Sequence, residues 1–240
     1  MQKIMSRIAQ TCLMGFVIIA GAACSSVTVP PPAPQGAHIG ISLSAHTLIF
    51  PRQLTTIYFA RLEEGQGDFI SKSPLTPSNG NVGNRFYLLN ALPGRYVAVA
   101  ARGVDAKRRP EPAGSAQSLV VIGERAAYYV AFSKPLIALT EVKVEPGRLA
   151  FMGHFSVKVR VEWGKPRADE VQVDTFLRFE TPALLGSVQD VKQGVESGQE
   201  FLMKARDDLS ESAWGTIIQQ SLELLQKNEA DHGNAQYHGQ

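Results

Sequence analysis

Alternation between apolar and polar residues is the strongest constraint on what this chain of 240 residues can fold into. Between Phe151 and Trp163 the odd positions are apolar or glycine, and the even positions are polar except for Met152. This period of two indicates a strand with one buried and one solvated face. Such strands are typical of antiparallel sheets, because parallel sheets are usually covered on both faces. We therefore expect Phe155 in the core and Lys158 in solvent.

Similar patterns recur across the middle of the chain. Residues 39–44 and 171–179 alternate in the same way, and less regular strand-like runs lie at 55–62, 85–89, 95–101, 118–122, 127–132 and 140–144. Turn signals rich in Gly, Pro and Asn separate these runs, and no helical period of useful length lies between them. Many short strands with such turns predict a mainly β fold, an antiparallel β-sandwich of Ig-like or transthyretin-like type. We place this sandwich domain at residues 37–182.

One turn motif in this region is more specific than the rest. In Leu92-Pro93-Gly94-Arg95-Tyr96-Val97, proline presets φ at the first turn position and glycine takes a positive φ at the second. With its flanking strands, over residues 86–100, the motif resembles a hairpin of transthyretin-like sandwiches, including carboxypeptidase regulatory-like domains. The resemblance implies a fold and no activity. Residues 144–149 read as a second turn of the same kind.

The period changes after Pro182, and residues 183–228 are expected to form a C-terminal helical segment. A short helix is expected near 187–193, and the run from Ser197 to Glu200 fits a capping box. Apolar residues then recur at helical spacing: Trp214, Ile217, Ile218, Leu222 and Leu225. This stripe must be covered. It either packs on its own sandwich, which we favour, or binds a protein partner. Residues 229–240 are polar and aperiodic, which predicts a loose tail.

The first 23 residues have the layout of an export signal. Lys3 and Arg7 precede a mainly apolar run over residues 8–20, which is too short for a comfortable membrane span. Small residues follow, and Gly21-Ala22-Ala23-Cys24 resembles the lipobox of bacterial lipoproteins. The resemblance implies that Cys24 carries acyl chains such as palmitate and becomes the first mature residue. Plain secretion after cleavage at Ala22, or an uncleaved anchor, remain the alternatives.

Residues 24–36 read as a proline-rich tether. Pro30, Pro31, Pro32 and Pro34 exclude helix and central strand. An extended polyproline conformation, at about 3.1 Å per residue, would let this segment hold a domain roughly 35 Å from a membrane. By the same resemblance to lipoproteins, Ser25 after the cysteine implies the outer membrane.

Charge and cysteine content narrow the class of protein. The net charge of +2 comes from Lys3 and Arg7 in the signal, so the rest of the chain is balanced and predicts no nucleic-acid partner. The second cysteine, Cys12, lies inside the signal and would be lost on cleavage, which leaves the mature chain without an internal disulfide.

Sequence motifs for catalysis, cofactors and metals are missing. Apart from His232 and His238 in the tail, no two histidines stand at ligand spacing, so no metal or cofactor is expected. Three weaker candidates read more simply as solvated loops or strand packing. They are a calcium site at Glu63, Glu64 and Asp68, a phosphate site at Lys107, Arg108 and Arg109, and a sugar-binding face of Tyr87, Tyr96, Tyr128 and Tyr129.

These features predict a non-enzymatic envelope lipoprotein that is anchored to the membrane through Cys24, faces the periplasm or the surface, and binds or supports another envelope component. The alternative is a carbohydrate- or peptidoglycan-binding module, which would expose two or more aromatic side chains on one face. An envelope enzyme is the third hypothesis and the weakest, because the sequence has no paired acid–base or nucleophile signal.

Overall fold

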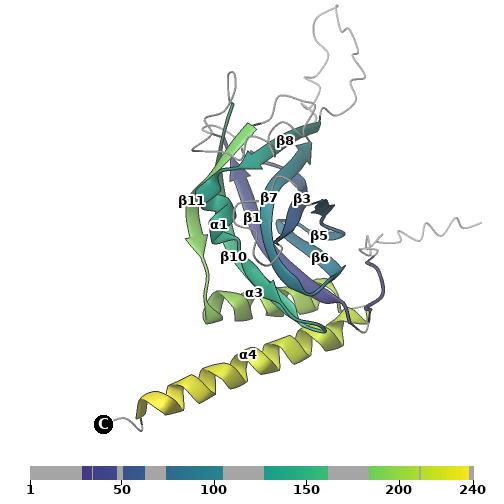
Figure 1. Cartoon of the computed structure of the whole chain (residues 1–240), viewed down its shortest axis with the longest axis vertical. Coiled ribbons are helices and arrows are strands. Elements are labelled where there is room, and N and C mark those ends of the chain that lie inside the picture. Colours follow the sequence, from purple (N-terminus) through teal and green to yellow (C-terminus); the bar gives the residue numbers. More distant parts are fainter. Residues whose placement is uncertain are drawn as a thin grey trace, which may run out of the picture.

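The computed structural model describes residues 29–33, 35–47, 51–62, 74–104, 127–161, 184–210 and 212–237. These residues form a mainly β structure in which one strongly curled sheet carries its two C-terminal helices on the outer side (Figure 1). The strands expected at 118–122 and 171–179 lie outside the described residues.

The sheet has eleven strands, and their order is β4-β3-β7-β8-β11-β10-β1-β6-β5, with β2 paired to β1 and β9 paired to β7. The strands are β1 (Ala37–His46), β2 (Pro51–Arg52), β3 (Leu54–Leu62), β4 (Leu75–Pro77), β5 (Gly80–Val82), β6 (Arg85–Ala91), β7 (Gly94–Val104), β8 (Ala127–Phe132), β9 (Val142–Val144), β10 (Leu149–Val161) and β11 (Leu184–Lys192). The helices are α1 (Lys134–Leu139), α3 (Val195–Asp208) and α4 (Trp214–Tyr237).

The sheet is mixed in direction. Strands β1 and β10 run parallel, as do β11 and β8, whereas the other pairs are antiparallel. The prediction of an antiparallel sandwich is therefore not confirmed. The physical reason is that a period of two shows which residues share a face, but it carries no information on the direction of the neighbouring strand.

The two ends of the sheet are joined through consecutive residues of the chain. Strands β4 and β5 are the two end strands of the order, and only Ser78 and Asn79 separate them. The backbone N–H of Ser78 donates to the Ile57 carbonyl on β3, at 2.7 Å. The Asn79 side chain bonds both the N–H and the carbonyl of Leu89 on β6, each at 2.8 Å. Asn79 thus substitutes for a strand neighbour, and the sheet curls into a half-barrel.

The core has two layers, one on each face of the sheet. The larger cluster fills the inside of the curl and includes Ile39, Ile41, Phe59, Val157 and Phe155. The smaller cluster lies on the outside, beneath α3 and α4. Strand β6 supplies both layers, since Phe86 and Leu88 belong to the inner cluster, and Tyr87 and Leu89 to the outer one.

Helix α3 is seated on the sheet at a glycine. The Phe201 ring lies over Gly40 so closely that a Cβ built there would be 2.3 Å from Phe201 Cε1. The same ring stacks on Phe151 of β10, with centroids 4.4 Å apart. A small residue on β1 therefore lets the aromatic ring of the helix reach the sheet backbone.

The apolar stripe of α4 packs on this protein's own domain. Trp214, Ile218 and Leu222 are buried in the outer cluster, and Ile217 and Leu225 pack against it partly exposed. Two arrangements were considered for this stripe from the sequence. The structure has the first, in which the helix packs on its own domain.

A bulge changes the faces of β10. Gly40 pairs with Phe151, whereas Ser42 pairs with His154, so β10 has one extra residue at this point. Gly153 has a φ of +141°, which suits glycine in a bulge. Phe151 consequently faces the helices, and Met152, expected in solvent, is 2% exposed in the inner core. Beyond the bulge Phe155 is buried and Lys158 exposed, as the alternation predicts.

Four elements differ from the sequence-based expectations. Helix α3 begins at Val195 with Gly194 as its N-cap, so Ser197, expected to start a capping box, lies inside the helix and its hydroxyl donates to the Gly194 carbonyl. The residues near 187–193, expected as a short helix, belong to strand β11, whose pairing with β10 over Leu184–Lys192 outweighs the weak local pattern. Helix α4 continues to Tyr237, beyond residue 228 where the helical segment was expected to end. The short helix α1 was not foreseen; Ser133 caps it and Pro135 lies in its first turn. No helix of the described ranges is long and apolar enough to cross a bilayer.

The contact between Phe201 and β1 can be tested by adding one methyl group. Gly40→Ala should lower the free energy of unfolding by about 1–3 kcal/mol, because the new Cβ must displace a ring in a packed cluster. Denaturant unfolding measures the change. Gly215→Ala is the matched control, since its Cβ would lie 3.8 Å from the nearest atom, and it should leave stability unchanged or slightly higher. A Gly40→Ala protein as stable as the wild type would contradict this packing.

Candidate functional site

A hollow of about 280 Å³ lies between α3 and the outer face of the sheet, and we call it the polar groove. Its lining comes from β1, β6, β10, β11 and α3, and from the turn before β6: Ser42, Ser44, Asn84, Arg85, His154, Phe155, Ser156, Asp190, Lys192, Glu200 and Lys204. Most of these side chains are charged or carry a hydroxyl group, so the groove is the strongest candidate for a functional site in the described part of the chain.

The floor of the polar groove follows from the alternation of two strands. On β1, Ile41 and Leu43 point into the inner core, so Ser42 and Ser44 face outward. On β10, Ser156 faces the same way because Phe155 and Val157 are buried. Three small hydroxyl side chains therefore lie where larger ones would fill the hollow. The Ser44 hydroxyl donates to the Phe155 carbonyl at 3.5 Å, and each of the three oxygens can accept a hydrogen bond.

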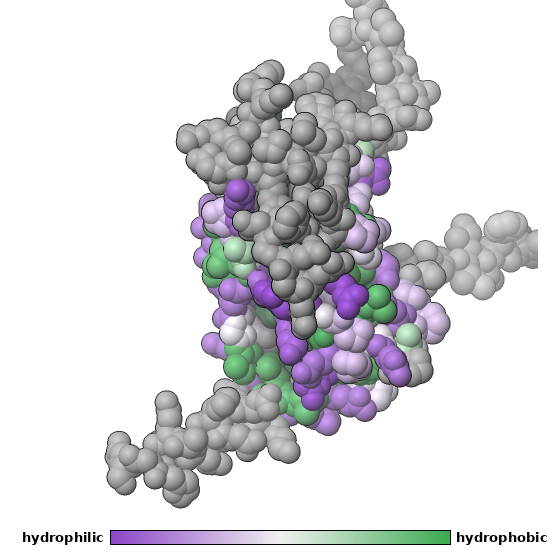
Figure 2. Space-filling model, in the orientation of Figure 1, coloured by the Kyte–Doolittle hydropathy of each residue, from purple (hydrophilic) through white to green (hydrophobic). Residues whose placement is uncertain are grey.

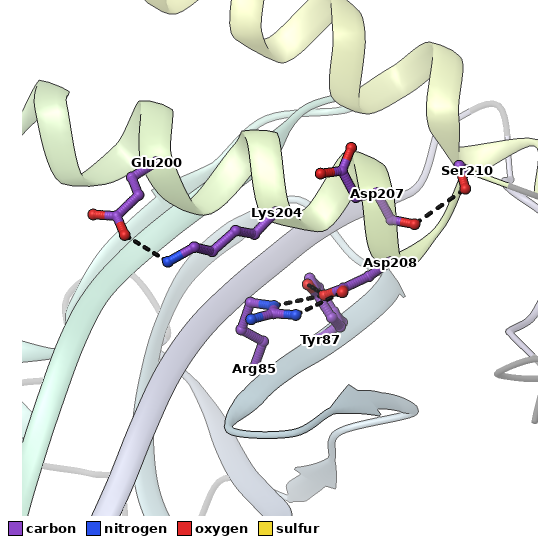
Figure 3. A network of polar contacts seen from close by, with 7 residues as sticks. All are labelled: Arg85, Tyr87, Glu200, Lys204, Asp207, Asp208 and Ser210. Atoms are coloured by element: carbon purple, nitrogen blue, oxygen red, sulfur yellow. Dashed lines mark hydrogen bonds and ion pairs between the residues drawn. The ribbon is translucent and has the colours of Figure 1, made fainter.

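The wall formed by α3 carries an ion pair. Lys204 Nζ lies 2.5 Å from Glu200 Oε1, one helical turn away, and both side chains are about half exposed (Figure 3). The hydrogen bond from Lys204 lowers the pKa of Glu200. An exposed pair of this kind contributes little to stability, so its charges can exchange partners with a ligand at small cost.

The opposite wall carries two further charges on β11. Asp190 and Lys192 are exposed, and neither has an ion-pair partner among the described residues. Being two positions apart on one strand, they point to the same face, with roughly 6–7 Å between their backbone positions. The groove thus presents both signs of charge from both walls.

His154 is the most enclosed titratable group of the groove. Its ring contacts Phe151 edge-on, at a centroid distance of 4.9 Å, and lies 6.2 Å from Phe201. Burial lowers the pKa of His154, so the ring is neutral near pH 7. Its Nε2 atom is buried with no hydrogen-bond partner in the described structure. The alternation along residues 151–163 predicted His154 on the polar face of a strand, and no sequence pattern indicated this enclosed environment.

One end of the polar groove is closed by a charged network that fixes α3 to β6. Arg85 donates through Nε and Nη2 to the two carboxylate oxygens of Asp208, at 2.6 Å each. The Tyr87 hydroxyl donates to the same carboxylate at 3.0 Å (Figure 3). Burial and the Asp208 charge raise the pKa of Tyr87, so it remains a donor. This bidentate arrangement is rigid, and its polar groups are already satisfied within the protein.

A second feature concerns the segment that was expected to be a free tether. The indole Nε1 of Trp214 donates to the Pro30 carbonyl at 2.7 Å. Asn90 donates to the Pro31 carbonyl and accepts from the Ala33 N–H, at 2.8 Å each. Val29 packs against the outer cluster, and the Gly36 carbonyl accepts from the Gly147 N–H. We call these contacts of residues 29–33 and Gly36 the N-terminal seat.

The seat is built on an unusual backbone conformation. Asn90 has a φ of +61°, a left-handed value that non-glycine residues rarely adopt, although asparagine tolerates it best. Its N–H donates to Nδ1 of His38, which is fully buried with its ring edge-on to Trp214 at 4.4 Å. Burial lowers the pKa of His38 to about 4, so the imidazole is neutral and can accept this bond.

The structure does not bring the sequence-predicted site residues together in one place. Cys24 and the candidate calcium and phosphate residues (Glu63, Glu64, Asp68, Lys107, Arg108 and Arg109) lie outside the described residues. The tyrosines do not form an exposed face: Tyr87 is in the outer cluster, and Tyr96 and Tyr128 are in the inner one. Within the described ranges, no three His, Cys, Asp or Glu side chains lie close enough to hold a metal ion.

A second, more apolar hollow of about 360 Å³ lies where α3 and α4 meet β10, and Val195, Leu202, Leu224 and Leu225 are among its lining residues. Figure 2 shows hydrophobic residues together near the lower edge of the molecule. Val195 and Leu224 are 42% and 37% exposed.

Comparison with known proteins gives no match: no family model fits the sequence, and no curated protein or solved structure is significantly similar to it. The resemblances to lipoproteins and to transthyretin-like domains therefore stay predictions, and function must be inferred from the residues themselves.

Neutral His38 makes stability depend on pH. Its folded pKa of about 4 lies below the ordinary value of 6.5, so the unfolded chain binds more protons between these values. The contribution of the neutral His38 to the free energy of unfolding is fully present above pH 6.5. It is lost as pH falls toward 4, by at most roughly 3 kcal/mol. His38→Asn, which can still accept from the Asn90 N–H, should remove most of this pH dependence. Denaturant unfolding at pH 7 and pH 4.5 measures it.

The control is His46→Asn, at the other end of β1. It should follow the wild type at both pH values. An equal loss of stability in wild type and His38→Asn would show that the buried imidazole is not its source.

Proposed function

We propose that this chain is a non-enzymatic lipoprotein of the bacterial outer membrane, acylated on Cys24, whose domain binds or supports another component of the cell envelope. The sequence supports the anchor through the export signal and the small residues before Cys24. The N-terminal seat adds a constraint to the proposal, because residues of the proline-rich segment are hydrogen-bonded to the domain and do not form a free spacer.

The seat changes what the anchor would do. Because Pro30, Pro31, Ala33 and Gly36 are hydrogen-bonded to the domain, only Cys24 to Thr28 precede the seat as a connection to the membrane. Five residues span at most about 18 Å when fully extended. The domain would therefore stand close to the lipid headgroups, with the Trp214 end nearest to them, rather than at the end of a long tether.

The anchor is tested by metabolic labelling with a fatty acid. The wild type should incorporate the label, and Cys24→Ser should not, because the thiol is the acceptor of the acyl chain. Equal labelling of both proteins, or labelling of neither, would contradict the lipid anchor.

The seat is tested separately by limited proteolysis of the full chain. Asn90→Gly keeps a residue that tolerates positive φ but removes the two side-chain hydrogen bonds to residues 31 and 33. We expect faster cleavage within residues 25–36 by a broad-specificity protease, while the domain itself resists. Asn84→Gly, in the exposed turn before β6, is the control and should be cleaved like the wild type. Unchanged cleavage in Asn90→Gly would contradict the seat.

The polar groove favours a second candidate function, a carbohydrate- or peptidoglycan-binding module. Its support differs from what the sequence suggested, since burial removes Tyr87, Tyr96 and Tyr128 from any shared exposed face. The serine hydroxyls and the charges of both signs around the groove offer polar recognition instead.

A further inference from the structure

The unpaired charges of the polar groove indicate the chemistry of its ligand more closely than the shape of the groove does. Glu200 is paired with Lys204, and Arg85 is paired with Asp208. Asp190 and Lys192 are exposed on one face of β11 and have no ion-pair partner among the residues that the structure describes. A ligand with one amine and one carboxylate would satisfy both, whereas a polyanion would be repelled by Asp190 and Glu200.

The floor of the groove leaves room for the main chain of such a ligand. Ser42, Ser44 and Ser156 have small side chains, so a bound chain can approach the sheet. Ser42 is 6% exposed, and the Ser44 hydroxyl donates to the Phe155 carbonyl but can still accept a hydrogen bond from the chain. The volume of about 280 Å³ lies just below the usual range for small-molecule pockets, which limits the ligand to a few residues.

We propose that the polar groove binds a short peptide with a free carboxylate and a free amine, in which Lys192 receives the carboxylate and Asp190 the amine. A saccharide is the less favoured ligand, because His154 is the only aromatic side chain among the outward-facing residues that line the described groove, and sugars are commonly held by stacking on exposed aromatic faces. In an envelope protein, the peptide stems of peptidoglycan have the required groups; this identification of the source rests on the proposed function.

The Lys204–Glu200 pair supplies a second contact for each end of the peptide. Both side chains are about half exposed, and they stand on the wall opposite β11. Their mutual attraction is weak in water, so each can turn to a ligand group of opposite charge. The ligand would therefore lie along β11, in the groove between this strand and α3, with the serines of β1 and β10 beneath it.

The experiment titrates the full chain, purified in detergent, with trialanine, which has one free amine and one free carboxylate. Amide shifts of labelled protein in NMR spectra report binding at β11. Trialanine amide and N-acetyl-trialanine each lack one charge, and tri-N-acetylglucosamine is the saccharide probe. We expect trialanine to bind and both blocked peptides to bind at least about tenfold more weakly.

Two single substitutions test which terminus of the peptide each charged residue of β11 binds. Lys192→Glu and Asp190→Lys should each weaken trialanine binding at least about tenfold, because each places a like charge beside a ligand terminus. Lys158→Glu, an exposed lysine of β10 outside the groove, is the matched control and should bind like the wild type. Thermal unfolding confirms that each variant is folded, which is expected since all three positions are exposed.

Several outcomes would overturn the proposal. They are no trialanine binding at tens of millimolar, wild-type affinity in either β11 variant, or binding of the saccharide probe without trialanine. The titrations do not depend on acylation. A negative result therefore leaves the fatty-acid labelling of Cys24 untouched, and a failure to label Cys24 leaves the peptide site standing while removing the identification with peptidoglycan stems.

Discussion

The indole of Trp214 joins the three parts of this molecule. It is 1% exposed, it begins helix α4, and it packs in the outer cluster that attaches both C-terminal helices to the sheet. Its ring faces His38 of β1, and its N–H holds the Pro30 carbonyl. The helices, the first strand and the N-terminal segment therefore share one buried contact. Loss of the indole would disturb all three at once, since clusters of this density do not repack freely.

The outer cluster also determines where the polar groove can exist. Phe201 covers the part of the outer sheet face where it packs against Gly40, Tyr87 and Phe151. Beyond the helix the same face continues with serines and charged residues, and α3 forms the wall. Along β1 the outward positions change from Gly40, which Phe201 covers, to Ser42, which is 6% exposed, and then to Ser44, which is partly exposed in the groove. The site is thus the uncovered remainder of a helix-packing surface.

The sequence predicted which face of the sheet a side chain occupies better than it predicted which strands and helices lie next to each other. Alternation correctly placed Phe155 inside and Lys158 outside, because side-chain direction is local to a strand. It failed at Met152, since a single bulge residue at Gly153 inverts every position before it. The polar groove could not be predicted, because it combines β1, β10, β11 and α3, and β11 itself was read as helix. The seat was hidden for another reason: proline-rich composition indicates an extended backbone but not its hydrogen-bond partners.

The seat and the groove are connected by a strand of fixed length. Residue 36 ends the seat and β1 begins at Ala37, after which the chain rises about 3.3 Å per residue. Ser42 is therefore roughly 17 Å along the strand from Ala37, and no flexible joint lies between them, since β1 is paired on both sides with β10 and β6. If Cys24 is acylated as proposed, a paired strand sets the distance from the seat to the groove, and the five residues from Cys24 to Thr28 limit how far the seat can stand from the membrane. An anchor of this kind would select ligands by their height above the lipid surface as well as by their charge.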